Sequence, residues 1–549
     1  MTLYLGLDCS TQSLTAILIE VEGRRRAVRF EQSIVFDRDL PEFRTVNGVL
    51  RDADDSHVVV APPLMWAAAL DRMMPGVVRA CGTDAARLAA ISGSAQQHGS
   101  VYLNSAAERV LDQLDPGLDL AVQLAGVFSR DLSPVWMDSS TTVQCQAMTD
   151  ALGGPLALAR LTGSRAFERF TGPQIRKFHE HEPDAYARTD RIHLVSSFMA
   201  SLLVGRHAPV EPGDGSGMNL LDLASGDWSP AALAATAPDL RRRLPDVAPS
   251  STVVGRLSPY WRRRYGLPPA KVIAWSGDNP CSLIGVGLVR EGRVAVSLGT
   301  SDTVFGFMRE PRVDESGTGH VFGSPTGDYM GLTCFANGSL ARERIRQRYS
   351  LDWAGFSAAL RETPPGNRGG VMLPWFDPEI TPPVQAAGVR RYALDPADGP
   401  SNVRAVVEGQ MMAMALHSRW MGVRIDTIHA TGGASVNREI VQVMAGVFGA
   451  DVVLLPERNS ACLGAALRAY HGDELSSGRA MTWDDVVAGL AEPAPGDRLR
   501  PDARDAASYA DLIRVYEACE AHALGLGADP LPRIAEFRAR GRSRLSPEP

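Results

Sequence analysis

The stretch that decides the fold is Val294-Ala295-Val296-Ser297-Leu298-Gly299-Thr300-Ser301-Asp302-Thr303. It begins as an apolar, β-branched run, breaks at Gly299 and continues into hydroxyls, which is typical of a strand that delivers a polar turn. The same layout stands near the N-terminus, where Gly6-Leu7-Asp8-Cys9-Ser10-Thr11 joins two alternating strands. Two like hairpins, over 3–19 and 294–308, predict two related domains that face one nucleotide.

The tips of these hairpins suit phosphate. Their backbone N–H groups and hydroxyls can hold phosphate oxygens, and Asp8 can bind a hydrated Mg²⁺. Two alternatives stay open. Each tip can be an exposed turn, because Asp, Ser and Thr are common there for local hydrogen-bonding reasons. The likeness of the two turns can also be chance.

A carboxylate and an amide stand together in Trp275-Ser276-Gly277-Asp278-Asn279-Pro280. Gly277 and Pro280 predict a sharp turn that holds Asp278 and Asn279 in a set direction. Because this carboxylate precedes a phosphate-type turn, the segment suggests a phosphoryl-transfer centre. The alternative is a polar loop before an edge strand.

Length and composition set the class of protein. A chain of 549 residues predicts two large domains, and 45% hydrophobic with 22% charged residues is ordinary for a globular protein. A net charge of -7 argues against a dedicated nucleic-acid binder. The apolar runs are too short for a membrane span, and the N-terminus has no basic leader, so we expect no signal peptide. Seven scattered cysteines without a Cys-x-x-Cys pair favour a reduced, cytoplasmic protein without structural zinc.

The first half offers groups that can bind a polyol. Gln97 and His98 follow a buried strand, where polar residues line ligand crevices in α/β folds. Trp136 beside Asp138 suits a sugar, and Arg169, in the polar loop 162–173, can hold a substrate hydroxyl. The alternatives are a structural histidine that caps a turn and a surface tryptophan. The glycine-rich turn 213–222 lacks a Walker ending, and we interpret it as a structural turn near the sugar.

The second half offers groups that can bind a nucleoside. The strand at 428–431 runs into Gly432 and Gly433 and then into a helix whose first turn contains Asn437. Glycines let the backbone approach a ligand, and a helix N-terminus favours anions. A plain strand-to-helix turn is the alternative. Trp353, in a looser segment, can cover a base, and residues 364–402 look like a lid or a surface elaboration.

Two stretches of the second half are predicted to be solvated or loosely ordered. The arginine-rich helix after Ser339 is interpreted as having a solvated charged face. The charged tail from about Arg533 is predicted to be loosely ordered.

Together these segments resemble the FGGY family of carbohydrate kinases, of the actin, sugar kinase and Hsp70 superfold, and within it the animal-type xylulose kinases. The resemblance runs from residue 3 to about 530. It implies an α/β fold of two actin-like, ribonuclease H-like ATPase domains around a central cleft. A sugar-binding domain over 1–288 and a nucleotide-binding domain over 289–549 would meet at a hinge within 250–290. The runs that carry it are 92–102, 162–175, 214–221, 277–280, 296–303 and 430–439.

The resemblance also implies the reaction and the residues that perform it. The reaction is transfer of the ATP γ-phosphoryl group, with Mg²⁺, to the terminal hydroxyl of a ketose, D-xylulose, giving D-xylulose 5-phosphate. Asp278 would be the general base, and Asp8 would hold Mg²⁺ through water. The implied sugar ligands are His98, Arg169, Asp278 and Asn279, with Gln97 and Asp138 as neighbours. The implied phosphate and nucleotide ligands are Ser10, Thr11, Thr300, Trp353, Gly432, Gly433, Ala434 and Asn437.

Several alternatives remain at this level. The chain can be a kinase for another ketose or polyol, such as ribulose or fuculose, a non-catalytic sugar sensor, or an ATPase of the same superfold. Many bacterial relatives carry Gly-Glu-Arg-Thr-Pro where this chain has Asp377-Pro-Glu-Ile-Thr-Pro382. That difference in charge puts lid details taken from them in doubt. The expected partners are a sugar and ATP, with no nucleic acid or membrane, in a monomer or homodimer.

Overall fold

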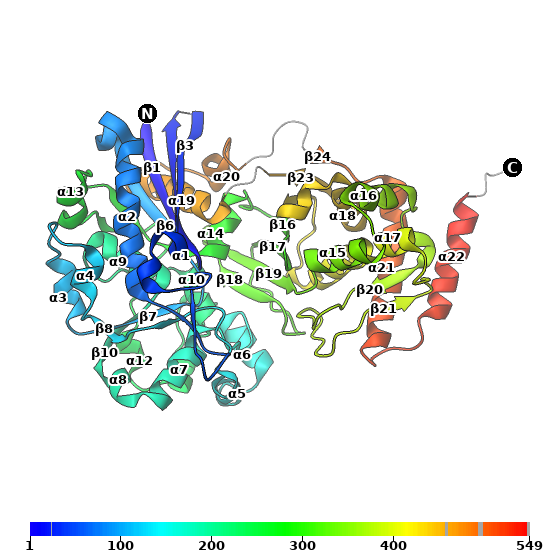
Figure 1. The fold of residues 1–549 in the computed structure, drawn as a ribbon, viewed down its shortest axis with the longest axis horizontal. Helices are drawn as coiled ribbons and strands as arrows, with labels where there is room; N and C mark the ends of the chain where they lie inside the picture. The colour runs from blue at the N-terminus through cyan, green and yellow to red at the C-terminus, as the bar shows by residue number, and fades with distance from the viewer. Residues whose placement is uncertain (24, 456–458, 492–497, 546–549) are drawn as a thin grey trace.

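The structure, a computed structural model, describes residues 1–23, 25–455, 459–491 and 498–545. Two lobes lie side by side in Figure 1: the first is mainly blue to green and also holds the orange helix α19, and the second is mainly green to red. Each lobe is built on a seven-stranded sheet.

The first sheet has the strand order β13-β14-β6-β1-β2-β3, with β15 paired to β6. The predicted hairpin forms its centre: β1 and β2 are antiparallel, with Asp8 opposite Thr15. β1 also pairs with β6 in parallel. The strands are β1 Thr2–Cys9, β2 Ser13–Glu22, β3 Arg25–Val35, β6 Leu88–Ala95, β13 Val253–Arg256, β14 Lys271–Ile273 and β15 Ser276–Gly277.

The second sheet repeats this arrangement, in the order β18-β19-β17-β16-β22-β23-β24. β16 pairs antiparallel with β17 and parallel with β22, just as β1 pairs with β2 and β6. The predicted pair of related α/β domains, each begun by a hairpin, is therefore confirmed. The strands are β16 Arg293–Leu298, β17 Asp302–Met308, β18 His320–Gly323, β19 Tyr329–Phe335, β22 Thr427–Thr431, β23 Asp451–Leu454 and β24 Arg498–Leu499.

Two helices cover opposite faces of the first sheet. Helix α2 (Pro63–Cys81) packs on β2 and β3. Helix α19 (Ser460–Ser476) packs on β1 and β6, although it lies late in the chain. Its small residues are needed for close packing, because a Cβ on Gly464 would overlap the carbonyl oxygen of Cys281 in helix α14 (Asp278–Gly285). The domain boundary at 288 stays a prediction, since α19 lies with the first sheet.

The second lobe corrects two predictions. In helix α15 (Ser339–Arg348), Arg342 is fully buried rather than solvated, and it forms a two-point ion pair with Asp302, at 2.9 and 3.1 Å. A buried guanidinium needs such a partner, which the sequence pattern does not reveal. The tail predicted to be loose forms helix α22 (Leu531–Leu545), although 546–549 lie outside the described residues. The other main helices are α16 Trp353–Glu362, α17 Gly399–His417, α18 Arg438–Phe448 and α21 Ala503–Ala523.

A smaller layer extends the first lobe. Its three-stranded sheet, in the order β10-β7-β8, is surrounded by short helices. The elements are β7 Ser100–Asn104, β8 Phe128–Arg130, β10 Thr189–Leu194, α5 Thr142–Ala151, α6 Pro155–Thr162, α7 Thr171–His181, α8 Pro183–Arg188, α9 Val195–Val204, α11 Pro230–Thr236 and α12 Leu240–Arg243.

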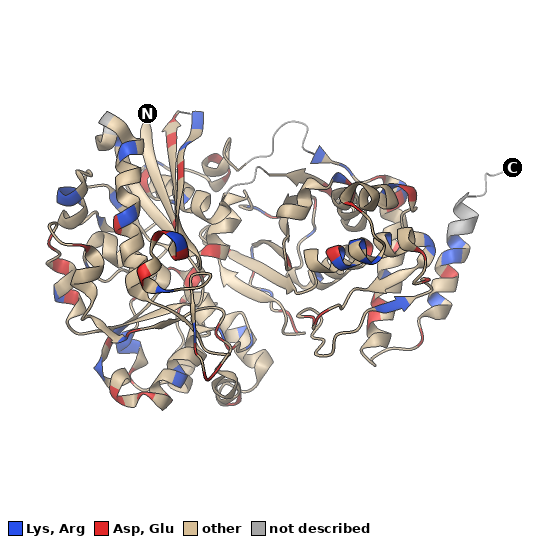
Figure 2. Cartoon of the chain, in the orientation of Figure 1, with Lys and Arg blue, Asp and Glu red and all other residues tan. Residues whose placement is uncertain are grey.

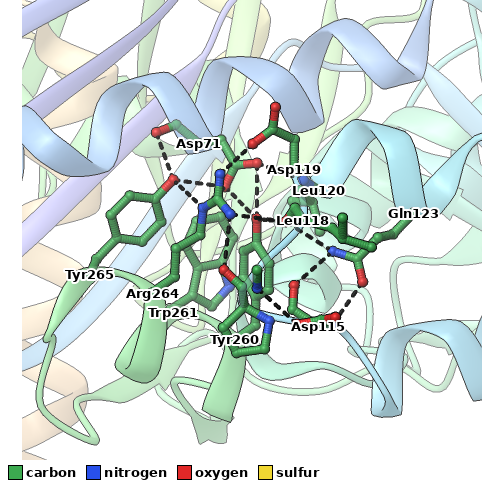
Figure 3. Close-up of polar contacts among 12 residues, drawn as sticks. Asp71, Asp115, Leu118, Asp119, Leu120, Gln123, Tyr260, Trp261, Arg264 and Tyr265 are labelled. Atoms are coloured by element: carbon green, nitrogen blue, oxygen red, sulfur yellow. Dashed lines mark hydrogen bonds and ion pairs between the residues drawn. The ribbon is translucent and has the colours of Figure 1, made fainter.

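Helix α13 (Pro259–Tyr265) packs against helix α2 of the first lobe (Figure 3). The hydroxyls of Tyr260 and Tyr265 both donate to Asp71 Oδ1 of α2, at 2.8 and 3.0 Å, and Arg264 pairs with Asp119. Burial raises the pKa of Asp71 against these partners. The cluster fixes the start of the chain that leads to β14 and Asp278.

Charged side chains of both signs lie mainly on the outer helices of both lobes, and the central strands are largely uncharged (Figure 2). Among the described residues, no helix combines the length and apolar character that crossing a membrane requires.

Candidate active site

Asp278 is the first residue of helix α14 and directly follows β15. β15 pairs in parallel with the end of β6, which places Asp278 beside the residues that follow β6. A Cβ on Gly277 would overlap the Gln97 side chain and lie 2.9 Å from Asp214 Oδ1, so glycine is needed there for close approach. The predicted sharp turn is the start of this helix, with Pro280 in its first turn, where proline is tolerated.

The surroundings of Asp278 suit a general base. Burial and the nearby Asp8 carboxylate raise the pKa of Asp278 to about 7. The Asn279 backbone N–H donates to Asp278 Oδ1 at 2.8 Å and limits this rise. A carboxyl group with such a pKa can take up and release a proton near neutral pH.

Asp8 is buried at the end of β1 and is held by three donors. Oδ1 accepts a hydrogen bond from Ser94 Oγ at 2.5 Å, and Oδ2 accepts from Ser10 Oγ and from Asn459 Nδ2, the latter at 3.0 Å. One oriented carboxylate beside a phosphate-type turn fits hydrated Mg²⁺, which usually takes one or two protein carboxylates and keeps several waters. Sequence reasoning missed Ser94 and Asn459, because both reach Asp8 only through the folded sheet and helix α19.

Each hairpin tip is supported by residues from another segment of the chain. The Trp136 indole N–H donates to Thr11 Oγ1 at 2.8 Å. In the second tip, Thr300 is exposed, and Ser339 N–H donates to the carbonyl oxygen of Gly299 at 2.9 Å. A Cβ on Gly338 would lie 2.5 Å from the carbonyl oxygen of Thr300, so the turn before α15 supports this tip closely.

His98 is buried with a neutral ring. Its Nδ1 lies 2.7 Å from the carbonyl oxygen of Gly217, in the glycine-rich turn, and its ring stacks on Phe170 at 4.3 Å. Burial, with the nearby charge of Arg169, lowers its pKa to about 3. The carbonyl can only accept, so Nδ1 carries the proton and Nε2 is an acceptor, the form that can accept a hydrogen bond from a sugar hydroxyl.

Gln97 joins the Asp278 turn to the glycine-rich turn. Its Oε1 accepts from Asn279 Nδ2 at 2.8 Å, and its Nε2 donates to the carbonyl oxygen of Gly213 at 3.3 Å.

The Asp138 carboxylate is already hydrogen-bonded within the protein. It accepts from Val59 N–H, Ser140 and Gln174, at 2.6 to 3.0 Å. These donors give Asp138 a structural role and occupy most of its acceptor capacity, so its contact with a sugar stays a prediction.

Arg169 lies just before helix α7 and packs among aromatic rings. Its guanidinium carbon lies 4.9 Å from the ring centre of Phe167 and 5.6 Å from that of Phe170. Its Nη2 lies 3.0 Å from His320 Nε2 of strand β18, in the second sheet. The sequence pointed to Arg169 but not to His320, a lone histidine in a short apolar strand.

Two further acidic residues, Asp214 and Glu211, lie near Asp278. Ser196 Oγ donates to Asp214 Oδ2, while Asp214 Oδ1 is buried without a protein partner. Burial, with nearby Asp278 and Glu211, raises the pKa of Asp214 well above its usual range, which favours the uncharged form of this carboxyl group. Glu211 accepts from Ser276 Oγ and from Gly213 N–H, which holds the glycine-rich turn next to Asp278.

The predicted nucleotide turn lies against the second hairpin. Gly432 has a φ of 85°, and a Cβ there would lie 2.6 Å from the carbonyl oxygen of Leu298, one residue before the hairpin tip. A Cβ on Gly433 would meet no described atom within 4 Å. Gly433, Ala434 and the residues up to Val436 form a short 3-10 turn that leads into helix α18. The structure therefore places Gly432 against Leu298, next to the second hairpin tip, while contact of these residues with a nucleotide stays a prediction.

Asn437 and Trp353 are linked. Asn437 Oδ1 caps α18 through Glu439 N–H at 3.1 Å, and its Nδ2 donates to Ser357 Oγ at 2.9 Å. Ser357 Oγ in turn donates to the carbonyl oxygen of Trp353. Trp353 begins helix α16 instead of lying in a looser segment, and the residue is 47% exposed, with its ring beside the guanidinium of Arg346. Contact of either residue with a nucleoside stays a prediction.

Both halves of the chain match known domains. Residues 133–285 match the N-terminal domain of the FGGY family of carbohydrate kinases, and residues 294–472 match its C-terminal domain. The chain belongs to this family.

Individual FGGY relatives cover almost the whole chain. A xylulose kinase of Rattus norvegicus is 44% identical over 96% of this chain and 98% of its own length. Xylulose kinase 2 of Arabidopsis thaliana is 42% identical over 86% of this chain and 87% of its own length. The crystal structure of a Rhodospirillum rubrum xylulose kinase, at 20% identity, covers 95% of this chain and 99% of its own with a TM-score of 0.79, which shows the shared fold.

Proposed function

We propose that this FGGY kinase transfers the γ-phosphoryl group of ATP to the terminal hydroxyl of D-xylulose, giving ADP and D-xylulose 5-phosphate. ATP is the phosphoryl donor that membership of a kinase family implies. The choice of D-xylulose is supported by the xylulose kinases that are 42 to 44% identical to this chain.

One observation carries the proposal: Asp278, with a pKa of about 7, begins α14 beside Gln97, His98 and Asp8. In the reaction, Asp278 accepts the proton of the sugar hydroxyl as the hydroxyl oxygen forms a bond to the γ-phosphorus. The bond between the γ-phosphorus and the bridging oxygen breaks, and ADP leaves with its electron pair on the β-phosphate oxygen. Proton transfer to a placed base contributes roughly 10²–10⁴ in rate. The proton leaves Asp278 when the product departs.

The other residues bind and orient. Neutral His98 accepts a hydrogen bond from one sugar hydroxyl through Nε2, and Arg169 donates to another oxygen of the ketose. Thr11 and Thr300, at the hairpin tips, offer N–H and hydroxyl donors to the phosphates. Ser10 donates its hydroxyl to Asp8 and its N–H to the carbonyl oxygen of Ser13, so its contact with phosphate stays a prediction. Asp8 would hold Mg²⁺ through water, and the ion would neutralise phosphate charge. Gly432, Gly433, Ala434 and Asn437, with Trp353, would hold the adenosine.

Sugar-dependent ADP release tests the proposal. The purified protein, with MgATP, is offered D-xylulose, D-ribulose, D-fructose and glycerol in turn, and the product is identified by mass and by the position of its phosphate. We expect the highest kcat/KM with D-xylulose. A higher kcat/KM with another acceptor would assign a different substrate. ADP release that does not depend on any acceptor would favour an ATPase, and its absence altogether would favour a sugar sensor.

A further inference from the structure

Strand β18 belongs to the second sheet but also forms hydrogen bonds with residues of the first half of the chain. It is an edge strand, paired on one side with β19. On its other side, Val321 N–H donates to the carbonyl oxygen of Gly163, and Gly323 N–H donates to Ser216 Oγ, both at 2.9 Å. A Cβ on Gly163 would overlap the carbonyl oxygen of Val321. The edge of the nucleotide half thus contributes directly to the surroundings of the sugar residues.

His320, the first residue of β18, is buried and uses both ring nitrogens. Its Nε2 lies 3.0 Å from Arg169 Nη2, and its Nδ1 lies 3.0 Å from Ser164 Oγ. A guanidinium can only donate, so Nε2 accepts, and the proton of the neutral ring stands on Nδ1 and is donated to Ser164. Burial, with the nearby Arg169 charge, keeps the pKa of His320 well below its usual value, in agreement with this state.

Aromatic rings fix the direction of this contact. The His320 ring stacks on Phe322 at 5.7 Å with an interplanar angle of 11°, and it lies 4.8 Å from Phe167. Phe167 also lies under the guanidinium of Arg169. Among the described residues, no carboxylate lies within ion-pair distance of Arg169. The imidazole is therefore the hydrogen-bonded contact that sets the guanidinium plane, and four N–H donors remain for other partners.

We propose that His320 is a positioning residue for the ketose: it holds Arg169 in the orientation that binds the sugar, and it makes sugar binding depend on how the two halves of the chain sit against each other. This rests on the proposed function, in which Arg169 is a sugar ligand. Because His320 comes from the nucleotide half, a shift of β18 away from the glycine-rich turn would release Arg169 and weaken sugar binding.

Three substitutions of His320 test the contact. In His320→Gln, the side-chain amide reaches the place of Nε2 and keeps an acceptor for Arg169. In His320→Asn it reaches only the place of Nδ1, and in His320→Met there is no strong acceptor. A hydrogen bond to a charged group is lost in the last two, so we expect the sugar KM to rise roughly 10- to 100-fold. The ATP KM should stay within about twofold, and His320→Gln should restore most of the sugar affinity.

A double-substitution cycle with Arg169→Met separates positioning from general damage. If His320 acts through Arg169, then His320→Met should have little further effect on sugar KM in the Arg169→Met background. His429, buried in β22 with its Nδ1 on the carbonyl oxygen of Val286, gives a matched control as His429→Met. Thermal unfolding of each variant reports its folding, and His320→Asn serves where His320→Met does not fold.

The outcomes are distinct. Three results would overturn the role of His320 while the proposed function stands. They are an unchanged sugar KM in His320→Asn and His320→Met, a sugar KM in His320→Gln that rises as much as in His320→Met, and full additivity of His320→Met with Arg169→Met. If the wild-type enzyme prefers another acceptor, the same comparison is made with that acceptor. A wild-type protein that phosphorylates no acceptor would overturn both proposals.

Discussion

Replacing Asp278 by asparagine should abolish most turnover and stabilise the folded chain at the same time. The pKa of Asp278 is raised from an ordinary 3.8 to about 7. At about 1.36 kcal/mol for each pKa unit, keeping this group ionised in the folded chain costs up to about 4 kcal/mol above pH 7. Asparagine cannot ionise, so Asp278→Asn removes that cost and keeps an oxygen that accepts from Asn279 N–H.

The sign follows from the direction of the shift. Because the pKa is higher in the folded than in the unfolded chain, the folded state favours the protonated form. The contribution of Asp278 to the free energy of unfolding of the wild type is therefore fully present below about pH 4, and it is lost as the pH rises through about 7. The stability difference between Asp278→Asn and wild type should therefore be below about 1 kcal/mol near pH 4 and reach about 4 kcal/mol at pH 8.

Urea unfolding of both proteins at pH 4.5 and 8, with ADP release at pH 8, measures the two effects. We expect a loss of roughly 10²–10⁴ in kcat and little change in D-xylulose affinity. Asp138→Asn is a control of opposite sign, because the Asp138 carboxylate accepts several hydrogen bonds and its loss should destabilise the fold. Near-normal turnover in Asp278→Asn would remove Asp278 from the role of base. No gain in stability at pH 8 would refute the electrostatic reasoning.

Three further predictions follow from the same geometry. In the wild type, kcat/KM for the sugar should fall as pH drops, with an apparent pKa near 7, because the base must be ionised. Asp214→Asn should keep this profile and activity within about threefold, because burial already favours the uncharged form of this carboxyl group and asparagine is uncharged; a tenfold loss measured by ADP release would contradict this. Gly432→Ala should lower the melting temperature and raise the ATP KM, because a φ of 85° and the Leu298 carbonyl exclude a Cβ, while Gly433→Ala should leave the melting temperature unchanged.

The hairpins could be predicted because their signal is local. An alternating strand, a polar tip and a second strand stand within about 15 residues, and strand pairing needs little else. The repetition at 3–19 and 294–308 then indicated the duplication, which the two sheets confirm through the same order of pairing around β1 and β16. Asp278 was found the same way, since glycine and proline around a carboxylate mark a constrained turn.

Groups that act across long sequence distances could not be predicted. The charged pattern of α15 predicts a solvated face, yet Arg342 is buried because the fold brings Asp302 and Gln410 to its guanidinium. Asn459 reaches Asp8 only because α19 returns from the second half to pack on the first sheet. Neither contact can be predicted from the local sequence, because each residue alone resembles an ordinary surface residue.

The packing of α19 on the first sheet also affects the proposed catalytic group, Asp278. The N-cap residue of the helix is Asn459, which donates a hydrogen bond to Asp8. The helix crosses α14, which begins at Asp278, at a point where glycines bring the two backbones together. The electrostatic neighbours Asp8 and Asp278 are therefore both set by one helix from the late part of the chain. A change at this crossing, such as a Cβ on Gly464, would displace both carboxylates at once. The sequence predicts each carboxylate separately, but the spacing between them, which raises the pKa of Asp278, depends on this packing of α19.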